Sequence, residues 1–177
     1  MKKRTLLSFV ICIVCISSLV GQSAKEMNIE KVATLDAIIA TLYDIVSGEK
    51  TEKRDWELLK YLCKSDAKLI VHSEGQNGDK STTYMALDDY IDRAGSSFSK
   101  KDFFEREIHR TVDTFGPITQ VFSTYESFDS KTAETPFVRG INSIQLLNDG
   151  ERWWIINIYW TSESDTNPIP EKYLPKD

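Results

Sequence analysis

The chain has 177 residues, a net charge of −5 and 41% hydrophobic residues, as expected for one acidic globular domain. No run of Lys or Arg follows the first four residues. This charge pattern disfavours nucleic-acid binding and attachment to an anionic membrane through a basic surface.

Residues 1–21 have the pattern of a secretory signal peptide. Three basic residues precede an apolar run over 6–20, and small polar residues follow it. We expect cleavage after Gly21, with cleavage after Ala24 as the alternative. The mature protein is then exported to the periplasm or secreted, and it has no membrane attachment once the signal is removed.

The alternative to a cleaved signal is a membrane anchor. The apolar run is shorter than the ~20 residues that a membrane-spanning helix needs. A lipid anchor is disfavoured because Cys12 and Cys15 follow large apolar residues. Cys63 is then the only thiol of the mature chain, so no internal disulfide is expected. We interpret it as a buried apolar thiol, because no histidine lies close to it in the sequence.

Helical periodicity dominates the first part of the mature chain. Apolar residues recur at helical spacing over 31–47, 54–63 and 85–98. A short buried strand is predicted over 67–73, and residues 74–84 form a polar loop with two glycines.

Four long strands are predicted after residue 100, with short turns between them. A Gly-Pro turn and an Asn-Asp-Gly turn separate two of the pairs. The predicted strands are 102–114, 118–128, 137–147 and 152–162, and a proline-containing tail, 164–177, is expected to lie extended on the surface.

This order of elements predicts an α+β fold in which helices cover one face of a curved antiparallel sheet. The two layers form a cone with a cavity between them, where a small molecule could bind. We assign the domain to residues 31–163, after an N-terminal extension, 22–30.

Two segments resemble the nuclear transport factor 2-like (NTF2-like) superfamily, and within it the SnoaL-like proteins of bacteria. One is DWELLKYLCKSDAKLIVH, 55–72, where Asp-Trp opens a helix that runs into a strand. The other is RGINSIQLLNDGERWWIINIYW, 139–160, a strand, a turn and a Trp-rich last strand. The resemblance implies the cone-shaped fold and a homodimer through the sheet. It implies no single function, because the superfamily includes isomerases, cyclases, dehydratases and transport adaptors.

The last strand supplies the candidate binding residues. Strict alternation places Trp153, Asn157 and Tyr159 on one face, which the resemblance places toward the helices. Asn157 would then bind a ligand or satisfy backbone groups in the core. The other face, with Trp154 and Trp160, is also apolar, which favours a second subunit against it. Tyr125 is a further candidate phenol for the pocket.

Histidine and acidic residues give only weak catalytic candidates. His72 follows an apolar strand and is the weak candidate for a general base. Glu105, Glu107 and His109 would share one polar face of a strand, interpreted as solvated or as an interface edge. No motif for a metal or a cofactor is present, so none is expected.

Arg139 and Gly140 open the predicted strand 137–147. Arg139 would pair with Glu126 or Glu107 across the sheet or, less favoured, hold an anionic ligand. Gly140 is interpreted as a bulge that bends the sheet.

Three functions are compatible with these observations. The first is an exported, dimeric, non-catalytic domain that binds a small, partly apolar molecule. The second is a SnoaL-like isomerase, cyclase or dehydratase in which His72 or a nearby carboxylate acts as base. The third is an adaptor or oligomerisation domain whose pocket is filled by its own side chains.

Overall fold

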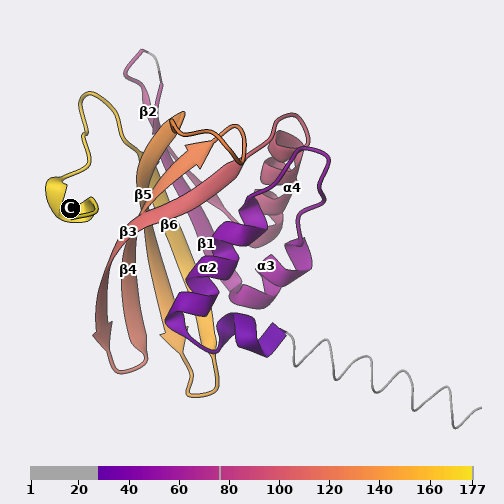
Figure 1. The fold of residues 1–177 in the computed structure, drawn as a ribbon. Helices are drawn as coiled ribbons and strands as arrows, with labels where there is room; N and C mark the ends of the chain where they lie inside the picture. The colour runs from indigo at the N-terminus through magenta and orange to yellow at the C-terminus, as the bar shows by residue number, and fades with distance from the viewer. Residues whose placement is uncertain (1–27, 76, 177) are drawn as a thin grey trace, which may run out of the picture.

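Helices and a six-stranded sheet make two layers in the computed structural model, which describes residues 28–75 and 77–176 (Figure 1). The predicted leader and both expected cleavage positions lie outside the described residues. The helices are α2 (Leu35–Val46), α3 (Trp56–Leu62) and α4 (Leu87–Phe98), with the 3-10 turns η1 (Glu30–Val32) and η2 (Glu171–Tyr173). The strands are β1 (Cys63–Glu74), β2 (Lys80–Met85), β3 (Phe104–Phe115), β4 (Ile118–Phe128), β5 (Val138–Asn148) and β6 (Trp153–Ser162).

Short polar side chains cap the beginnings of α2 and α3. The hydroxyl of Thr34 accepts a hydrogen bond from the Ala37 amide at the start of α2, at 3.0 Å. Asp55 accepts one from the Leu58 amide at the start of α3, at 2.9 Å. These N-caps satisfy amide groups that have no partner within the helix. All three predicted helices are present, and their bounds differ from the sequence prediction by a few residues.

The strand order in the sheet is β2-β1-β6-β5-β4-β3. All neighbours are antiparallel except β1 and β6, which run parallel and pair Leu69 with Ile158. The α+β fold with helices on one face of the sheet is confirmed. The prediction of a purely antiparallel sheet is wrong at this one pair, which joins the two halves of the chain.

Strand β2 lies where a polar loop over 74–84 was predicted. It pairs antiparallel with β1 and forms one edge of the sheet. Of its six residues only Met85 is buried, so its sequence lacks the alternation that identifies a half-buried strand. The backbone pairing with β1 defines this strand, and its side chains give no signal.

Two β-bulges change which side chains face the helices. In β6, Asn157 pairs with Gln145 and Ile155 with Leu146, so Ile156 is an extra residue. In β3 the pairing likewise skips Ile108. Because successive residues of a strand point to opposite faces, each bulge shifts the alternation of every residue that follows it.

The hydrophobic core fills the space between the helices and the sheet. Aliphatic residues of α2 and α3 pack on the inner face of β4, β5 and β6. The largest fully buried side chains are Ile38, Ile39, Leu59, Leu62, Ile144, Leu146 and Ile155.

The C-terminal tail lies on the opposite face of the sheet, away from the helices (Figure 1). The ring of Tyr173 packs on Phe122 of β4 with a centroid distance of 5.3 Å. The hydroxyl of Thr124 donates to the Tyr173 carbonyl oxygen at 2.6 Å. The tail thus covers part of the sheet face that was expected to bind a second subunit.

Gly140 makes room for an aromatic ring and is not a bulge. Its pairing with Tyr125 on β4 continues the regular register of β4 and β5. A Cβ atom at this position would overlap the Thr161 carbonyl oxygen and lie 2.5 Å from the Tyr125 phenol oxygen. The absent side chain therefore lets Tyr125 lie flat against the sheet.

We expect Gly140→Ala to lower the free energy of unfolding by about 2 kcal/mol, because a backbone oxygen and a packed ring must both move. Denaturant unfolding followed by circular dichroism measures the change. Gly150→Ala is the matched control, since Gly150 has open space around it and only its φ of +94° opposes a side chain. Equal costs for the two variants would show that the close approach at Gly140 has no energetic weight.

Candidate functional site

A cavity of about 320 Å³ lies between the helical layer and the sheet. Its walls are mostly apolar and include aromatic residues from both layers, among them Tyr43, Tyr90, Phe98, Tyr125 and Trp160. Only a few polar groups other than the phenols reach it, namely Arg93, Ser97, Glu105 and Asn142. A cavity with apolar walls and few polar groups is the usual form of a small-molecule site.

The end of α2 is bonded to the beginning of β3, and this junction places Glu105 in the cavity. Gly48 and Phe103 exchange two backbone hydrogen bonds, at 2.7 and 3.0 Å. The Ser47 hydroxyl accepts from the Glu105 amide at 2.9 Å. Arg54 donates to the carbonyl oxygens of Val46 and Gly48, so the last turn of α2 is held from both sides.

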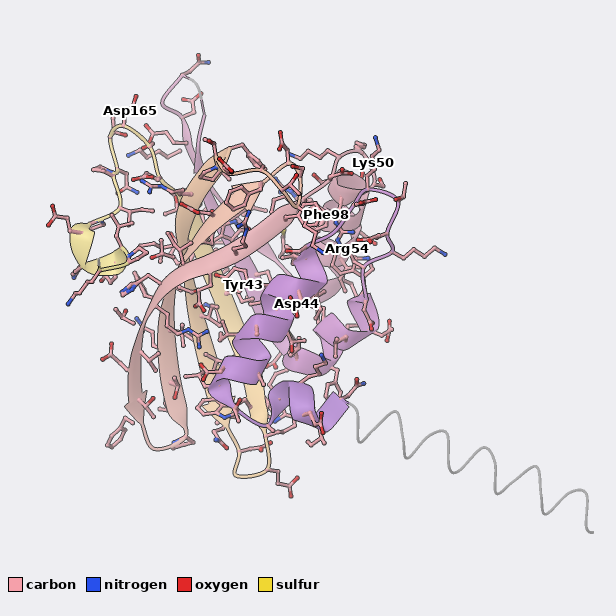
Figure 2. All side chains as sticks on the ribbon, in the orientation of Figure 1. Tyr43, Asp44, Lys50, Arg54, Phe98 and Asp165 are labelled. Carbon is pink, nitrogen blue, oxygen red and sulfur yellow. The ribbon has the colours of Figure 1, made fainter. Side chains whose placement is uncertain are left out.

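Figure 2 shows Tyr43 on α2, with Arg54 and Phe98 beside each other near the far end of that helix. The Arg54 guanidinium lies 5.4 Å from the centre of the Phe98 ring. Phe98 in turn stacks on Phe103, with a centroid distance of 4.7 Å. Phe98 and Phe103 both line the cavity, so this contact supports part of its wall.

Glu105 is the acidic group of the cavity. Its carboxylate accepts hydrogen bonds from Ser127 at 3.1 Å and from the Asn142 amide at 3.5 Å. It forms no ion pair with any described residue. Burial disfavours the charged form and raises the pKa of Glu105 to about 7, while the two hydrogen bonds oppose this shift. Near neutral pH the carboxyl group therefore exists in both protonation states.

Three phenols surround this carboxyl group and stay protonated. Burial raises the pKa of Tyr125 to about 12 and raises that of Tyr43 and Tyr90 above the ordinary value of 10. The Tyr43 hydroxyl is already bonded to Asn142 and Ser123. Tyr90 has no side-chain hydrogen bond within the described chain, and Tyr125 has one long contact of 3.4 Å to Ser162. Tyr90 and Tyr125 are thus the phenols free to donate to a ligand.

A chain of polar contacts leads from Tyr43 to the protein surface. Ser123 donates to Glu107 at 2.5 Å, so the proton between Tyr43 and Ser123 belongs to the phenol. Glu107 pairs with Arg110, which also bonds the exposed Asp36 of α2 at 2.8 Å. This network satisfies Glu107 and fixes the orientation of Tyr43.

The interpretation of the polar face of β3 as solvated is wrong for Glu105 and Glu107. Both carboxylates bond to groups of β4 beneath the helical layer. The bulge at Ile108 separates His109 from these two glutamates. The buried Nε2 atom of His109 has no hydrogen-bond partner among the described residues.

The structure separates the residues predicted to bind a ligand. Tyr125 lines the cavity, and Trp153 packs against the core without lining the cavity. Asn157 and Tyr159 follow the bulge at Ile156, and neither residue lines the cavity. Tyr159 is 42% exposed. The expected facing of Asn157 and Tyr159 is therefore wrong, and Ile158 and Trp160 take their place.

His72 also lies outside the cavity. Its neighbours Leu69 and Val71 line the cavity, whereas His72 bonds to Thr82 on β2 at 2.9 Å. Arg139 lies opposite Glu126 in the register of β4 and β5, as predicted, but its ion pair is with Glu163 at 2.8 Å. Cys63 is buried, as predicted for an apolar thiol.

Sequence reasoning missed Asn142 and Glu105 as cavity residues. Asn142 carried a usable signal, because it interrupts the buried series of Gly140, Ile144 and Leu146 on one face of β5. Glu105 carried no such signal in the sequence, because its alternation with Glu107 is also typical of a solvated strand.

Similar solved structures share this fold at low sequence identity. An NTF2-like protein of unknown function from Silicibacter pomeroyi DSS-3 is 17% identical with a TM-score of 0.52, over 74% of this chain and 94% of that one. A Kribbella flavida protein is 15% identical with a TM-score of 0.53, over 75% and 90%. The benzoate 1,2-dioxygenase β subunit of Burkholderia mallei is 14% identical with a TM-score of 0.52, over 80% and 97%.

The fold is therefore NTF2-like, which confirms the part of the predicted resemblance that concerns the fold. Neither a protein-family model nor a curated protein sequence matches the chain. No helix within the described ranges is long and apolar enough to span a membrane. The described residues hold no group of three or more side chains suited to a metal ion.

The raised pKa of Glu105 predicts a specific dependence of stability on pH. Between the ordinary value of 4.5 and about 7 the folded protein keeps this proton and the unfolded chain loses it. The free energy of unfolding of the wild type, measured against Glu105→Gln, should therefore fall as pH rises through this range. The expected fall is on the order of 1–3 kcal/mol, with no further change above pH 8.

Urea unfolding at several pH values measures this difference, and the exposed Glu134→Gln is the matched control that should show none. Carboxyl ¹³C NMR gives an independent titration of Glu105. A midpoint near the ordinary value of 4.5 would contradict the proposed environment of the carboxyl group.

Proposed function

We propose that this protein binds a small, predominantly apolar molecule in the cavity between the helices and the sheet. The observation that carries the proposal is an open cavity with aromatic walls around one carboxyl group that has no ion-pair partner in the described chain. Its volume lies at the lower end of the range of about 300–1,000 Å³ for ligand sites. A ligand hydroxyl or amine could donate to Glu105, and a ligand oxygen could accept from Tyr90 or Tyr125.

The adaptor hypothesis, in which side chains fill the cone, receives less support. Aromatic residues line the cavity, yet a volume of about 320 Å³ remains between them. Apolar space of this size lowers stability unless a ligand or water occupies it. The unfilled volume is therefore better explained by ligand binding than by a cone filled with its own side chains.

Binding of an uncharged bicyclic probe tests the proposal. Isothermal titration calorimetry with 2-naphthalenemethanol should give binding to the wild type. Ala94→Phe places a ring in the cavity, because Ala94 is buried and lines it, and should reduce affinity at least tenfold. Tyr159→Ala, on the opposite face of the sheet, should leave affinity unchanged. No binding to the wild type, or equal binding to Ala94→Phe, would contradict the proposed site.

A second function, general base catalysis by Glu105, is favoured by its pKa of about 7. A base with this pKa is partly ionised at neutral pH and still basic enough to remove a proton next to a carbonyl group. Tyr90 or Tyr125 would donate to the enolate oxygen that forms. This proposal replaces His72, which lies outside the cavity, by a carboxylate.

Proton exchange of 2-tetralone in D₂O tests the catalytic function by NMR. The wild type should accelerate exchange at the carbon next to the carbonyl, with a rate that rises as Glu105 ionises around pH 7. Glu105→Gln should lose at least 100-fold of this acceleration, and Glu134→Gln should keep it. Equal exchange rates for the wild type and Glu105→Gln would contradict the catalytic function, and ligand binding alone would remain as the proposed function.

Export and a homodimer through the sheet are further proposals from the sequence. The dimer would use the outer face of the sheet beside the tail, where Ile156 and Tyr159 are exposed. Sedimentation velocity of the full chain and of Tyr159→Lys measures this directly, since a charge in the interface would dissociate a dimer.

A further inference from the structure

The cavity has a cationic group at its outer wall. Arg93 of α4 lines the cavity and is exposed to solvent. It forms no ion pair or side-chain hydrogen bond with any described residue. It differs in this from Arg54, Arg110, Arg139 and Arg152, which all bond carbonyl oxygens or carboxylates.

The nearby acidic residues of α4 are bonded elsewhere or lie off the cavity. Asp89, one turn before Arg93, accepts a hydrogen bond from the Ala86 amide at 3.1 Å. Asp88 pairs with Lys60 of α3 at 3.1 Å. Asp92 is exposed and does not line the cavity. The N–H donors of the Arg93 guanidinium are thus available to a bound ligand.

A second donor lies one helical turn further along α4. Ser97 also lines the cavity, and residues four apart share one face of a helix. Its hydroxyl has no hydrogen bond within the described residues, whereas Ser99 bonds back to the Ser96 carbonyl. A guanidinium and a hydroxyl on one helix face suit an anionic oxygen group.

The charges of the cavity give a bound molecule one orientation. Glu105 lies on the inner wall against β4 and β5, where Ser127 and Asn142 bond it. An anionic group beside it would meet an ionisable carboxyl and lose its hydration. The same group beside Arg93 would meet a cation and remain partly in water. Apolar and aromatic side chains make up most of the remaining lining.

We propose that the ligand is an amphiphilic carboxylate, with an apolar body in the cavity and its carboxylate paired with Arg93 at the opening. The Ser97 hydroxyl donates a further hydrogen bond to the carboxylate. This inference rests on the proposed binding function and specifies the chemical class of the ligand.

Two probes of one ring system test the charge alone. 2-Naphthoate carries the carboxylate, and 2-naphthalenemethanol has the same rings with an uncharged group. Calorimetry on the full chain should give about two- to fivefold tighter binding of 2-naphthoate, as expected for a partly exposed ion pair. Arg93→Gln should remove this preference, Arg93→Lys should restore part of it, and added NaCl should reduce it. Lys80→Gln removes the same charge from an exposed side chain that forms no ion pair or hydrogen bond within the described chain, and it should change nothing.

The outcomes separate the two proposals. If both probes bind equally and Arg93→Gln has no effect, the apolar site stands and the carboxylate inference is overturned. If Lys80→Gln weakens 2-naphthoate as much as Arg93→Gln, the preference comes from net charge and the assignment to Arg93 is overturned. If neither probe binds to the wild type, both proposals are overturned. Loss of the preference in Arg93→Gln alone, with unchanged binding of the alcohol, supports the assignment.

Discussion

The bonded junction between the end of α2 and the beginning of β3 determines the shape of the cavity. The backbone pairing of Gly48 with Phe103 and the contact of Ser47 with Glu105 hold a helix and an edge strand together. The helix carries Tyr43 and the strand carries Glu105, so one junction positions both polar walls. An ordinary loop here would leave the helix free to slide over the sheet, and the carboxyl group would meet water in place of Asn142 and Ser127.

Much of the architecture follows from local sequence patterns. Helical periodicity indicates α2, α3 and α4, and long segments separated by glycine turns indicate β3 to β6. Strand β2 escapes prediction because an edge strand with one contact face needs no apolar alternation. The parallel pairing of β1 with β6 is also hidden, because contacts between segments far apart in sequence leave no local signal.

The candidate site was harder to predict from the sequence than the fold, for a geometric reason. One inserted residue, Ile156, exchanges the faces of all later residues of β6, so Trp160 enters the cavity and Tyr159 leaves it. No residue type marks this bulge. The raised pKa of Glu105 arises from its burial, opposed by hydrogen bonds from β4 and β5, and only the folded chain assembles these surroundings. Tyr125 was the predicted binding residue that does line the cavity, whereas the signal carried by Asn142, a polar residue in an apolar series, was missed.

The parallel pairing of β1 with β6 also has a kinetic consequence. β1 follows the first helices, whereas β6 is the last strand, so the middle of the sheet closes only when nearly the whole domain has left the ribosome. Until then α2 and α3 have no complete sheet to cover, and their apolar faces remain exposed. Long-range closure of this kind slows folding and lengthens the life of partly folded states. The same topology keeps the nascent chain open until its last strand has been synthesised.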